Sequence, residues 1–251
     1  MAHRNRVEEY LNHLLEVERF PDYAPNGLQV EGREEIRRLA TGVTASLRLL
    51  EAAAASGADA VLVHHGYFWK GEDPRVVGMK AARLRLLLQS DINLFAYHLP
   101  LDAHPELGNN AGFGRMLDLT VERTMDAGGV PGLLWLGRCP PRSVNDLAGQ
   151  LASALGRTPT YVDGGPPAVE RVAWCTGGGQ RFIEQAADAG AQAFISGEIS
   201  EPTAHVARER GLHYFAAGHH ATERAGVKAL GAHLAERFDL EHFYIEVDNP
   251  A

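Results

Sequence analysis

The feature that most constrains this chain is an approximate internal repeat. Residues 40–60 align without gaps on residues 173–193 at a constant offset of 133, and eight of these 21 positions are identical. Alanine contributes many of the matches, but the order of elements repeats as well. In each copy a strand, a helix that ends in Gly-Ala and a second strand are followed by a helix and a third strand. The repeat predicts two related halves, each with strands and helices in alternation.

The strand and helix order also predicts the architecture. A β-α-β-α-β succession favours largely parallel or mixed sheets covered by helices, so the expected fold class is α/β. We place the boundary in the Gly- and Pro-bearing region from about residue 126 to 141, which gives a first half at 1–125 and a second half at 126–251. The final strand, 242–247, is not assigned to either half by the sequence and can pack back on the first.

Apolar spacing predicts helices at 5–19, 47–55 and 75–89 in the first half, and the second half begins with its own helix at 144–155. Ser46 is the expected N-cap of the second helix, which Gly57 ends. In the third helix the side chains expected to face inward are Val76, Met79, Leu84, Leu87 and Leu88.

Composition excludes several classes of protein. Hydrophobic residues make up 45% of the chain and charged residues 22%, which is typical of a globular fold. The two cysteines are too few for a disulfide framework or a thiolate metal cage. No apolar run approaches the roughly 20 residues of a membrane helix, and the charged N-terminal segment does not resemble a signal peptide. We therefore expect a cytoplasmic protein. A net charge of −8 disfavours a broad nucleic-acid surface.

The first group of chemistry-bearing residues is the pair His64 and His65, directly after a buried apolar strand. In open α/β sheets ligands gather at the carboxyl ends of strands. Adjacent side chains on a continuing strand point to opposite faces. Both imidazoles can therefore serve one site only if the strand ends there, which Gly66 permits. A His-His pair alone is as compatible with a structural role as with metal binding.

The second group, His98 and Asp102, also follows a strand. Pro100 lies between them, so helical spacing is not assured, yet a loop can present both side chains to one pocket. Asp102 is the better ligand candidate. His98 has three candidate roles, as a further ligand, a proton carrier or an orienting partner, beside the alternative of a packed structural histidine. His104 is expected to be exposed.

The third group is His219 and Glu223, in a segment that runs from a strand through Gly218 into a strongly helical stretch. If the helix begins at Gly218, residues four apart share one face of its first turn, which is a ligand spacing. His220 would then point elsewhere, as a surface residue. A helix-dipole partner is an alternative role for Glu223.

The three groups together predict a metal site. Imidazoles and carboxylates suit Zn, Fe, Mn, Co or Ni better than Ca²⁺. One ion rarely takes five protein ligands and stays reactive, so we expect two divalent ions bridged by a carboxylate and used for hydrolytic chemistry. The expected metal ligands are His64, His65, Asp102, His219 and Glu223.

Two further segments follow strands of the second half. Cys175 begins a glycine-rich turn whose amides can cradle a phosphate, although a tight strand-to-helix turn explains it equally well. Glu198 and Glu201 occupy the place equivalent to the paired histidines of the first half. They are expected either to line the same crevice or to cap the next helix.

These motifs resemble the NIF-three-like family, whose members are often labelled GTP cyclohydrolase 1 type 2 homologues. The resemblance covers nearly the whole chain and rests on NGLQV from Asn26, His64-His65, Asp102 in HLPLD, SGEI from Ser196 and GHHATE from Gly218. It implies a dinuclear site with Glu223 as the bridge and a toroidal homohexamer. His220 stands where the family usually has tyrosine. The short connection at 126–144 lacks the central domain that some relatives carry.

Function follows less directly than the site. The leading hypothesis is a dinuclear metal-dependent hydrolase of a nucleotide-like or phosphorylated small molecule, in which His98 moves a proton. The alternative is a non-catalytic regulator or scaffold whose metals order an assembly that acts through protein partners. A ring that encircles DNA is a third idea, and the acidic net charge disfavours it.

Overall fold

The computed structural model describes residues 1–251, which form two compact units. Unit 1 comprises Met1–Leu101 and Gly226–Asp248, and unit 2 comprises Asp102–Ala225 and Asn249–Ala251. These bounds differ from the halves expected at 1–125 and 126–251, because Asp102 begins unit 2 and the C-terminal helix and strand belong to unit 1. None of the helices has the length and apolar character needed to cross a membrane.

Unit 1 is built on a five-stranded sheet of order β13-β4-β5-β6-β2. Strands β13, β4, β5 and β6 run parallel, and β2 closes the edge antiparallel to β6. The elements of this unit are β1 Ala2–His3, α1 Arg4–Leu14, η1 Val17–Arg19, β2 Gly27–Val30, β3 Glu35–Ile36, β4 Arg38–Thr44, α2 Leu47–Ala55, β5 Ala60–His65, α3 Gly78–Gln89, β6 Asn93–Ala96 and β13 Glu241–Tyr244. The chain passes between the units at three points, within α4 Leu99–Ala103, within α10 Arg224–Phe238 and between Asp248 and Asn249.

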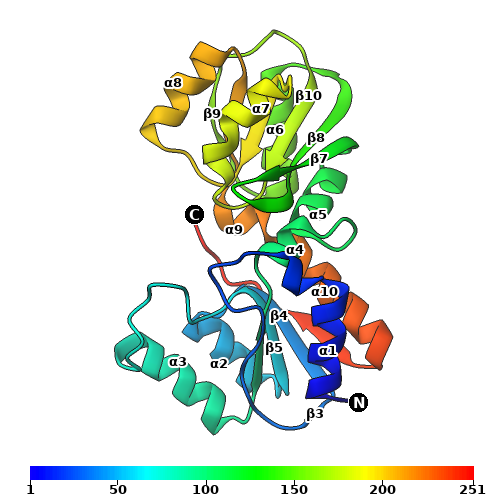
Figure 1. Cartoon of the computed structure of the whole chain (residues 1–251), viewed down its shortest axis with the longest axis vertical. Helices are drawn as coiled ribbons and strands as arrows, with labels where there is room; N and C mark the ends of the chain where they lie inside the picture. The colour runs from blue at the N-terminus through cyan, green and yellow to red at the C-terminus, as the bar shows by residue number, and fades with distance from the viewer. The chain divides into compact units, whose positions relative to one another are not determined.

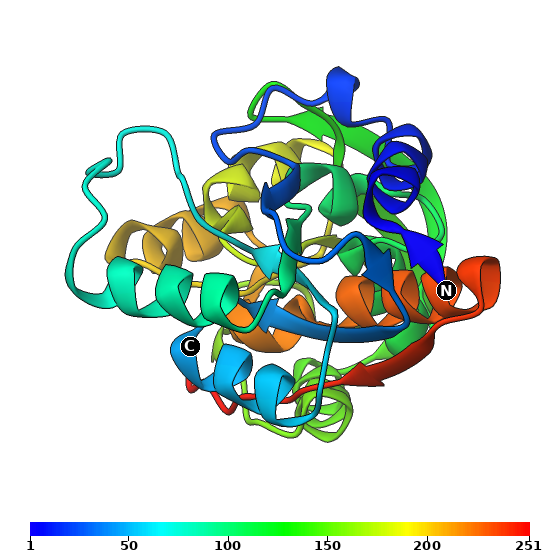
Figure 2. The same cartoon turned by 90° about the horizontal axis from the view of Figure 1, so that it is seen from below.

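Helices cover both faces of this sheet. Helices α2 and α3 lie on one face and α1 and α10 on the other (Figures 1 and 2). Leu49 and Leu50 of α2 and Leu87 of α3 pack into one apolar cluster with Val61 and Val63 of β5. Alternate residues of a strand point to the same face of the sheet, so Val61 and Val63 both face α2 and α3.

Unit 2 is built on a six-stranded sheet of order β7-β8-β10-β11-β12-β9. Strands β10, β11 and β12 run parallel, while β7, β8 and β9 pair antiparallel. Its elements are α5 Asn109–Met116, β7 Thr120–Ala127, β8 Val130–Arg142, α6 Val144–Leu155, β9 Thr160–Val162, β10 Val169–Cys175, η2 Gly179–Phe182, α7 Ile183–Asp188, β11 Ala193–Ser196, α8 Glu201–Arg210, β12 His213–Ala216 and α9 His219–Thr222.

The core of unit 2 is centred on Trp174 of β10, which is fully buried and packs with Phe113 of α5, Leu151 of α6 and Phe215 of β12. On the N-terminal side of α6, Ser143 and Asp146 form a reciprocal capping box. Helices α7 and α8 contact β11 and β12 respectively.

The predicted α/β fold is confirmed, and the two units share a local topology. In each, three consecutive parallel strands are flanked by an antiparallel edge strand beside the third: β4-β5-β6 with β2, and β10-β11-β12 with β9. The aligned positions Ala40 and Ala173 lie in β4 and β10, and Ala60 and Ala193 begin β5 and β11. The origin of the two units by duplication stays a prediction.

Two regions differ from their sequence expectations. The expected boundary region at 126–141 lies within unit 2, where β7 and β8 form a long antiparallel hairpin whose turn contains Gly128 and Gly129, both with positive φ. In α3, Val76 and Val77 precede the helix, and Met79 and Leu88 are exposed, whereas Leu84 and Leu87 are buried. An apolar side chain alone does not reveal which face of a helix meets the sheet.

The neighbouring residues Leu87 and Leu88 provide a matched test of this register. Leu87 is 0% exposed and Leu88 is 63% exposed. Leu87→Ala should lower the free energy of unfolding by about 2–5 kcal/mol, because it leaves a cavity in the core. Leu88→Ala should change it by less than about 0.5 kcal/mol. Urea denaturation followed by circular dichroism measures both, and equal losses would contradict the register of α3.

Candidate functional site

The candidate residues of unit 1 lie at the carboxyl ends of the central strands. His64 and His65 are the last two residues of β5, and His98 follows β6. The ring centroids of His64 and His65 are 4.5 Å apart, and His98 lies 5.1 Å from His64. Each of the three offers a ring nitrogen, and these nitrogens lie within 4.8 Å of one another. Strand β5 therefore ends at the point where both imidazoles can serve one site.

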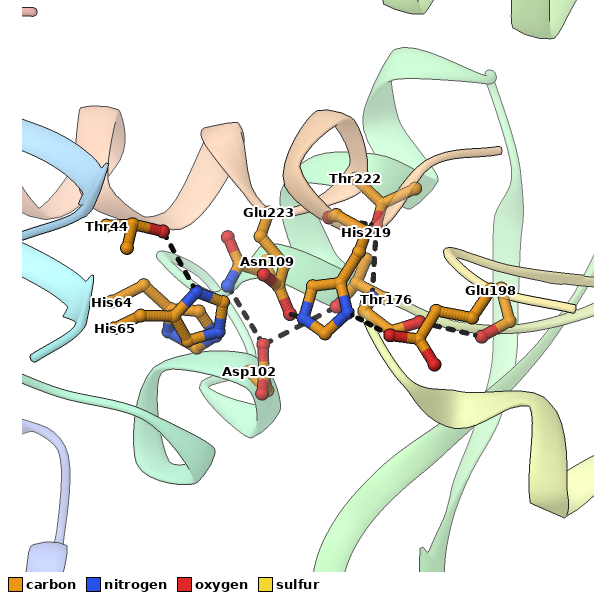
Figure 3. A network of polar contacts seen from close by, with 12 residues as sticks. Thr44, His64, His65, Asp102, Asn109, Thr176, Glu198, His219, Thr222 and Glu223 are labelled. Carbon is orange, nitrogen blue, oxygen red and sulfur yellow. Dashed lines mark hydrogen bonds and ion pairs between the residues drawn. The ribbon is translucent and has the colours of Figure 1, made fainter. Parts of the chain in front are cut away.

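Each of these imidazoles is held by an oxygen atom of unit 1. Nδ1 of His64 lies 2.9 Å from the carbonyl oxygen of Tyr97. Nδ1 of His65 lies 3.2 Å from the hydroxyl of Thr44, as Figure 3 shows. When Nδ1 donates to an oxygen, the lone pair of the neutral ring is on Nε2. Oxygen acceptors of this kind orient metal-binding histidines in proteins.

Asp102 is the first residue of unit 2 and lies in α4. Its carboxylate accepts a hydrogen bond from Nδ2 of Asn109 at 2.9 Å, and the hydroxyl of Thr176 lies 3.5 Å from the same oxygen (Figure 3). Thr176 belongs to the glycine-rich turn after β10. Asn109 begins α5 and is fully buried. The carboxylate is therefore oriented by neutral donors, with no cation among these partners.

His219 and Glu223 are brought together by the short helix α9. His219 begins the helix, Glu223 follows its last residue, and Nε2 of His219 lies 3.2 Å from Oε1 of Glu223. The spacing of four residues thus places both side chains on one face of a single turn, as expected from the sequence.

Glu198 holds the other nitrogen of His219. Its Oε1 lies 2.6 Å from Nδ1 of His219 (Figure 3), and the hydroxyl of Tyr214 donates to the backbone carbonyl of Glu198. Glu198 therefore stands in the same relation to His219 as the oxygen acceptors of unit 1 do to their histidines. Glu198 and Glu201 were expected either to line the site or to cap the next helix. Glu198 lies beside the candidate ligand His219. Glu201 begins α8 and pairs with the exposed His205.

The glycine-rich turn after β10 is required by the close approach of these side chains. Gly177 has a φ of +63°, and a Cβ atom there would collide with the carboxylate of Glu223. Its backbone N–H donates to the hydroxyl of Thr222 at 3.0 Å. The turn serves the packing of α9 against β10, which accounts for its glycines without a phosphate.

Two histidines differ from their expected environments. His220 was expected on the surface but is buried, at 8% exposure, and its backbone N–H donates to the carbonyl of Ala251. His104, expected to be exposed, is half-buried, and its Nδ1 accepts hydrogen bonds from the backbone of Glu106 and Leu107. Sequence periodicity could not show either, because both depend on local turns.

The electrostatics of unit 2 favour a cation at His219. Burial disfavours the charged imidazolium, but the hydrogen bonds and negative charges of Glu223 and Glu198 outweigh it and raise the pKa of His219 to about 9. The same two carboxylates would attract a metal cation, which binds His219 only after the proton has left the ring nitrogen.

Taken together, the fold and these groups define a class of α/β protein that carries oriented imidazoles and carboxylates at its strand ends. A sequence model of the family Duf34/NIF3 (NGG1p interacting factor 3) matches residues 2–250. The chain belongs to this family, which confirms the resemblance drawn from its motifs.

Relatives of known name and structure agree with this assignment. The chain is 57% identical over 244 residues to a GTP cyclohydrolase 1 type 2 homolog of Allochromatium vinosum, covering 96% of this chain and 95% of the relative. It is 54% identical over 246 residues to the protein of the same name from Pseudomonas aeruginosa, covering 98% of this chain and 97% of the relative.

Among solved structures, the chain is similar to protein ybgI, described as of unknown function, with a TM-score of 0.96, 52% identity and coverage of 99% and 100% of the two chains. It is also similar to TTHA1606 from Thermus thermophilus, with a TM-score of 0.91, 36% identity and the same coverage.

The raised pKa of His219 makes a testable prediction for metal-free protein. In wild type the imidazole should titrate near pH 9, and in Glu198→Gln its pKa should fall because one negative partner is removed. The pair stabilises the fold fully below the unfolded-state histidine pKa of about 6.5, and this contribution is lost as pH rises towards the folded value.

Histidine NMR titration of wild type and Glu198→Gln measures both pKa values. Glu201→Gln is the matched control, because Glu201 is exposed and contacts His205 instead. An unchanged pKa of His219 in Glu198→Gln would contradict the assigned role of Glu198.

Proposed function

We propose that this chain is a dinuclear divalent-metal-binding protein and a metal-dependent hydrolase of a nucleotide-like or phosphorylated small molecule. The metal ligands in this proposal are His64, His65, Asp102, His219 and Glu223, with Glu223 as the bridge. The name of the relatives, GTP cyclohydrolase 1 type 2 homolog, supports a hydrolytic reaction on a nucleotide-like compound.

One observation carries the metal-binding part of the proposal: the candidate histidines are oriented through Nδ1. Tyr97, Thr44 and Glu198 supply the oxygen atoms for His64, His65 and His219. A hydrogen-bond partner on Nδ1 fixes both the tautomer and the orientation of an imidazole, as a metal ligand requires.

The chemistry of the donor set fits the expected ions. Three neutral imidazoles and two carboxylates suit Zn, Fe, Mn, Co or Ni, and nothing in the set discriminates among them. Asp102 is oriented by Asn109, and Glu223 lies against Nε2 of His219. Both carboxylates are therefore already ordered by contacts within unit 2. Such prior order lowers the entropic cost of binding an ion.

The bound ions would act as Lewis acids that polarise a carbonyl, imine or phosphoryl group and lower the pKa of a bound water. The protein residues would have three tasks. The carboxylates and imidazoles hold the ions, Glu198 keeps His219 in the required tautomer, and His98 moves a proton to or from the reacting group. By resemblance to the family, the proposal also includes assembly into a toroidal homohexamer, which light scattering of the purified protein tests directly.

Replacement of the bridging carboxylate tests the metal site. Glu223→Ala should reduce bound metal from two equivalents per chain to fewer than one, because both ions lose a ligand. Metal analysis of protein purified without chelator, with isothermal titration of Mn²⁺ or Zn²⁺ into the metal-free protein, measures the loss. Glu201→Ala on exposed α8 is the matched control and should keep both ions. Full metal content in Glu223→Ala would contradict the bridging role.

A substrate screen tests the hydrolytic part. Metal-loaded wild type is expected to turn over at least one member of a panel of nucleotides and phosphate esters, and His65→Ala should lose that activity. His205→Ala serves as control, because His205 is exposed on α8 and pairs with Glu201. If turnover persists in His65→Ala, the activity arises elsewhere. An inert but metal-loaded wild type would support the scaffold hypothesis instead.

A further inference from the structure

The turn before β2 contains a buried carboxylate that the proposed function does not use. The side chain of Asp22 is only 3% exposed. Its Oδ1 accepts the backbone N–H of Tyr23 at 2.7 Å and of Ala24 at 3.1 Å. Its Oδ2 accepts Nδ2 of Asn26 at 3.0 Å and the backbone N–H of Leu99 at 3.0 Å. A carboxylate with this many donors is fixed in position and stays ionised.

Asp22 also contacts His98. Nδ1 of His98 lies 2.9 Å from Oδ1 of Asp22, and the backbone N–H of His98 donates to Oδ1 of Asn26 at 2.7 Å. The turn therefore forms hydrogen bonds with both the ring and the main chain of His98. Burial alone would raise the pKa of Asp22, but the hydrogen bond and charge of His98, with donors from Asn26 and Leu99, lower it to about 2.

The contact with Asp22 fixes which nitrogen of His98 carries the hydrogen. An ionised carboxylate only accepts, so Nδ1 of His98 carries the hydrogen and the lone pair of the neutral ring is on Nε2. His98 belongs with His64 and His65 to the group whose nitrogens lie within 4.8 Å of one another. The rings of Tyr23 and Trp69 pack edge to face on His98, with centroids 5.0 and 5.1 Å away, and hinder its rotation.

A second Asp-His pair provides a comparison within this fold. In unit 2, Oδ1 of Asp163 lies 3.1 Å from Nδ1 of His213, but Asp163 is 70% exposed. Nε2 of His213 is taken by the carbonyl of Pro166 at 2.8 Å, so both ring nitrogens have protein partners. His98 differs because its carboxylate is buried and only its Nδ1 is hydrogen-bonded within unit 1.

We propose that Asp22 is a positioning residue, which fixes His98 as the Nδ1–H tautomer with Nε2 directed to the His64–His65 pair, so that Asp22 and His98 form a dyad that carries protons. The assignment of tautomer stands on unit 1 alone. The carriage of protons rests on the proposed function, and the two parts are tested separately.

The tautomer is measured without metal or substrate. In long-range ¹H–¹⁵N NMR spectra of metal-free, ¹⁵N-histidine-labelled protein above neutral pH, with His98→Gln used for assignment, wild type should show His98 as the Nδ1–H form. Asp22→Ala should shift His98 towards the Nε2–H form, because the acceptor is gone. Asp22→Asn should keep the Nδ1–H form, since three donors surround Oδ1 and favour the amide oxygen there.

The two variants also guard against a simple folding defect, because Asp22→Asn keeps the size and one acceptor of the original side chain. Asp163→Ala is the matched control and should leave His98 unchanged. An Nε2–H form of His98 in wild type, or an unchanged Nδ1–H form in Asp22→Ala, would overturn the assignment.

Turnover tests the carriage of protons. With the substrate found by the screen, Asp22→Ala should lower kcat by about 100-fold, with KM and metal content unchanged, and Asp22→Asn should restore part of the loss. Loss of metal in Asp22→Ala, as expected for Glu223→Ala, or an unchanged kcat despite the altered tautomer would overturn the dyad. If wild type has no activity, the proposed function and the proton-carrying role fail together, while the tautomer spectra still decide the positioning role.

Discussion

One interaction recurs in both units, and the chemistry of the candidate site depends on it: an oxygen atom holds Nδ1 of each candidate imidazole. The acceptor is a carbonyl for His64, a hydroxyl for His65 and a carboxylate for His98 and His219. The energy of each such bond is modest, about 1 kcal/mol for neutral partners and more for charged ones. Their effect on chemistry is larger, because they decide which nitrogen can bind a cation or carry a proton.

The sheets explain why these residues occur where they do. In each unit the second and third strands of a parallel trio end in residues that bear functional groups. Strand β5 ends at His65 and β6 is followed by His98, while β11 is followed by Glu198 and β12 by His219. Parallel strands present their carboxyl ends at one edge, so side chains far apart in sequence meet there. The family to which the chain belongs is defined over this whole framework, since its sequence model spans residues 2–250.

Much of the fold could be predicted from the sequence, because many of its helices and strands follow from local patterns of apolar and turn residues. Helix α2 and its Ser46 cap, helix α6, and strands β4 and β5 follow from apolar spacing and turn residues. The pairing of His219 with Glu223 follows from a spacing of four. The hairpin of β7 and β8 was missed, because most of β7 is exposed and has no alternating apolar pattern. The partners of the candidate histidines could not be predicted, because they depend on contacts between distant segments. Asp22 lies 76 residues from His98 in sequence, and periodicity predicts only which face of an element is buried.

The central proposal is that His64, His65, Asp102, His219 and Glu223 bind a pair of divalent ions. Crystals grown without chelator in the presence of Mn²⁺ or Zn²⁺, with anomalous scattering recorded at the absorption edge of the metal, test it most directly. We predict two anomalous peaks per chain, with ligands drawn from His64 and His65 and from Asp102, His219 and Glu223. Peaks bound by other residues, or no peak in fully loaded crystals, would contradict it.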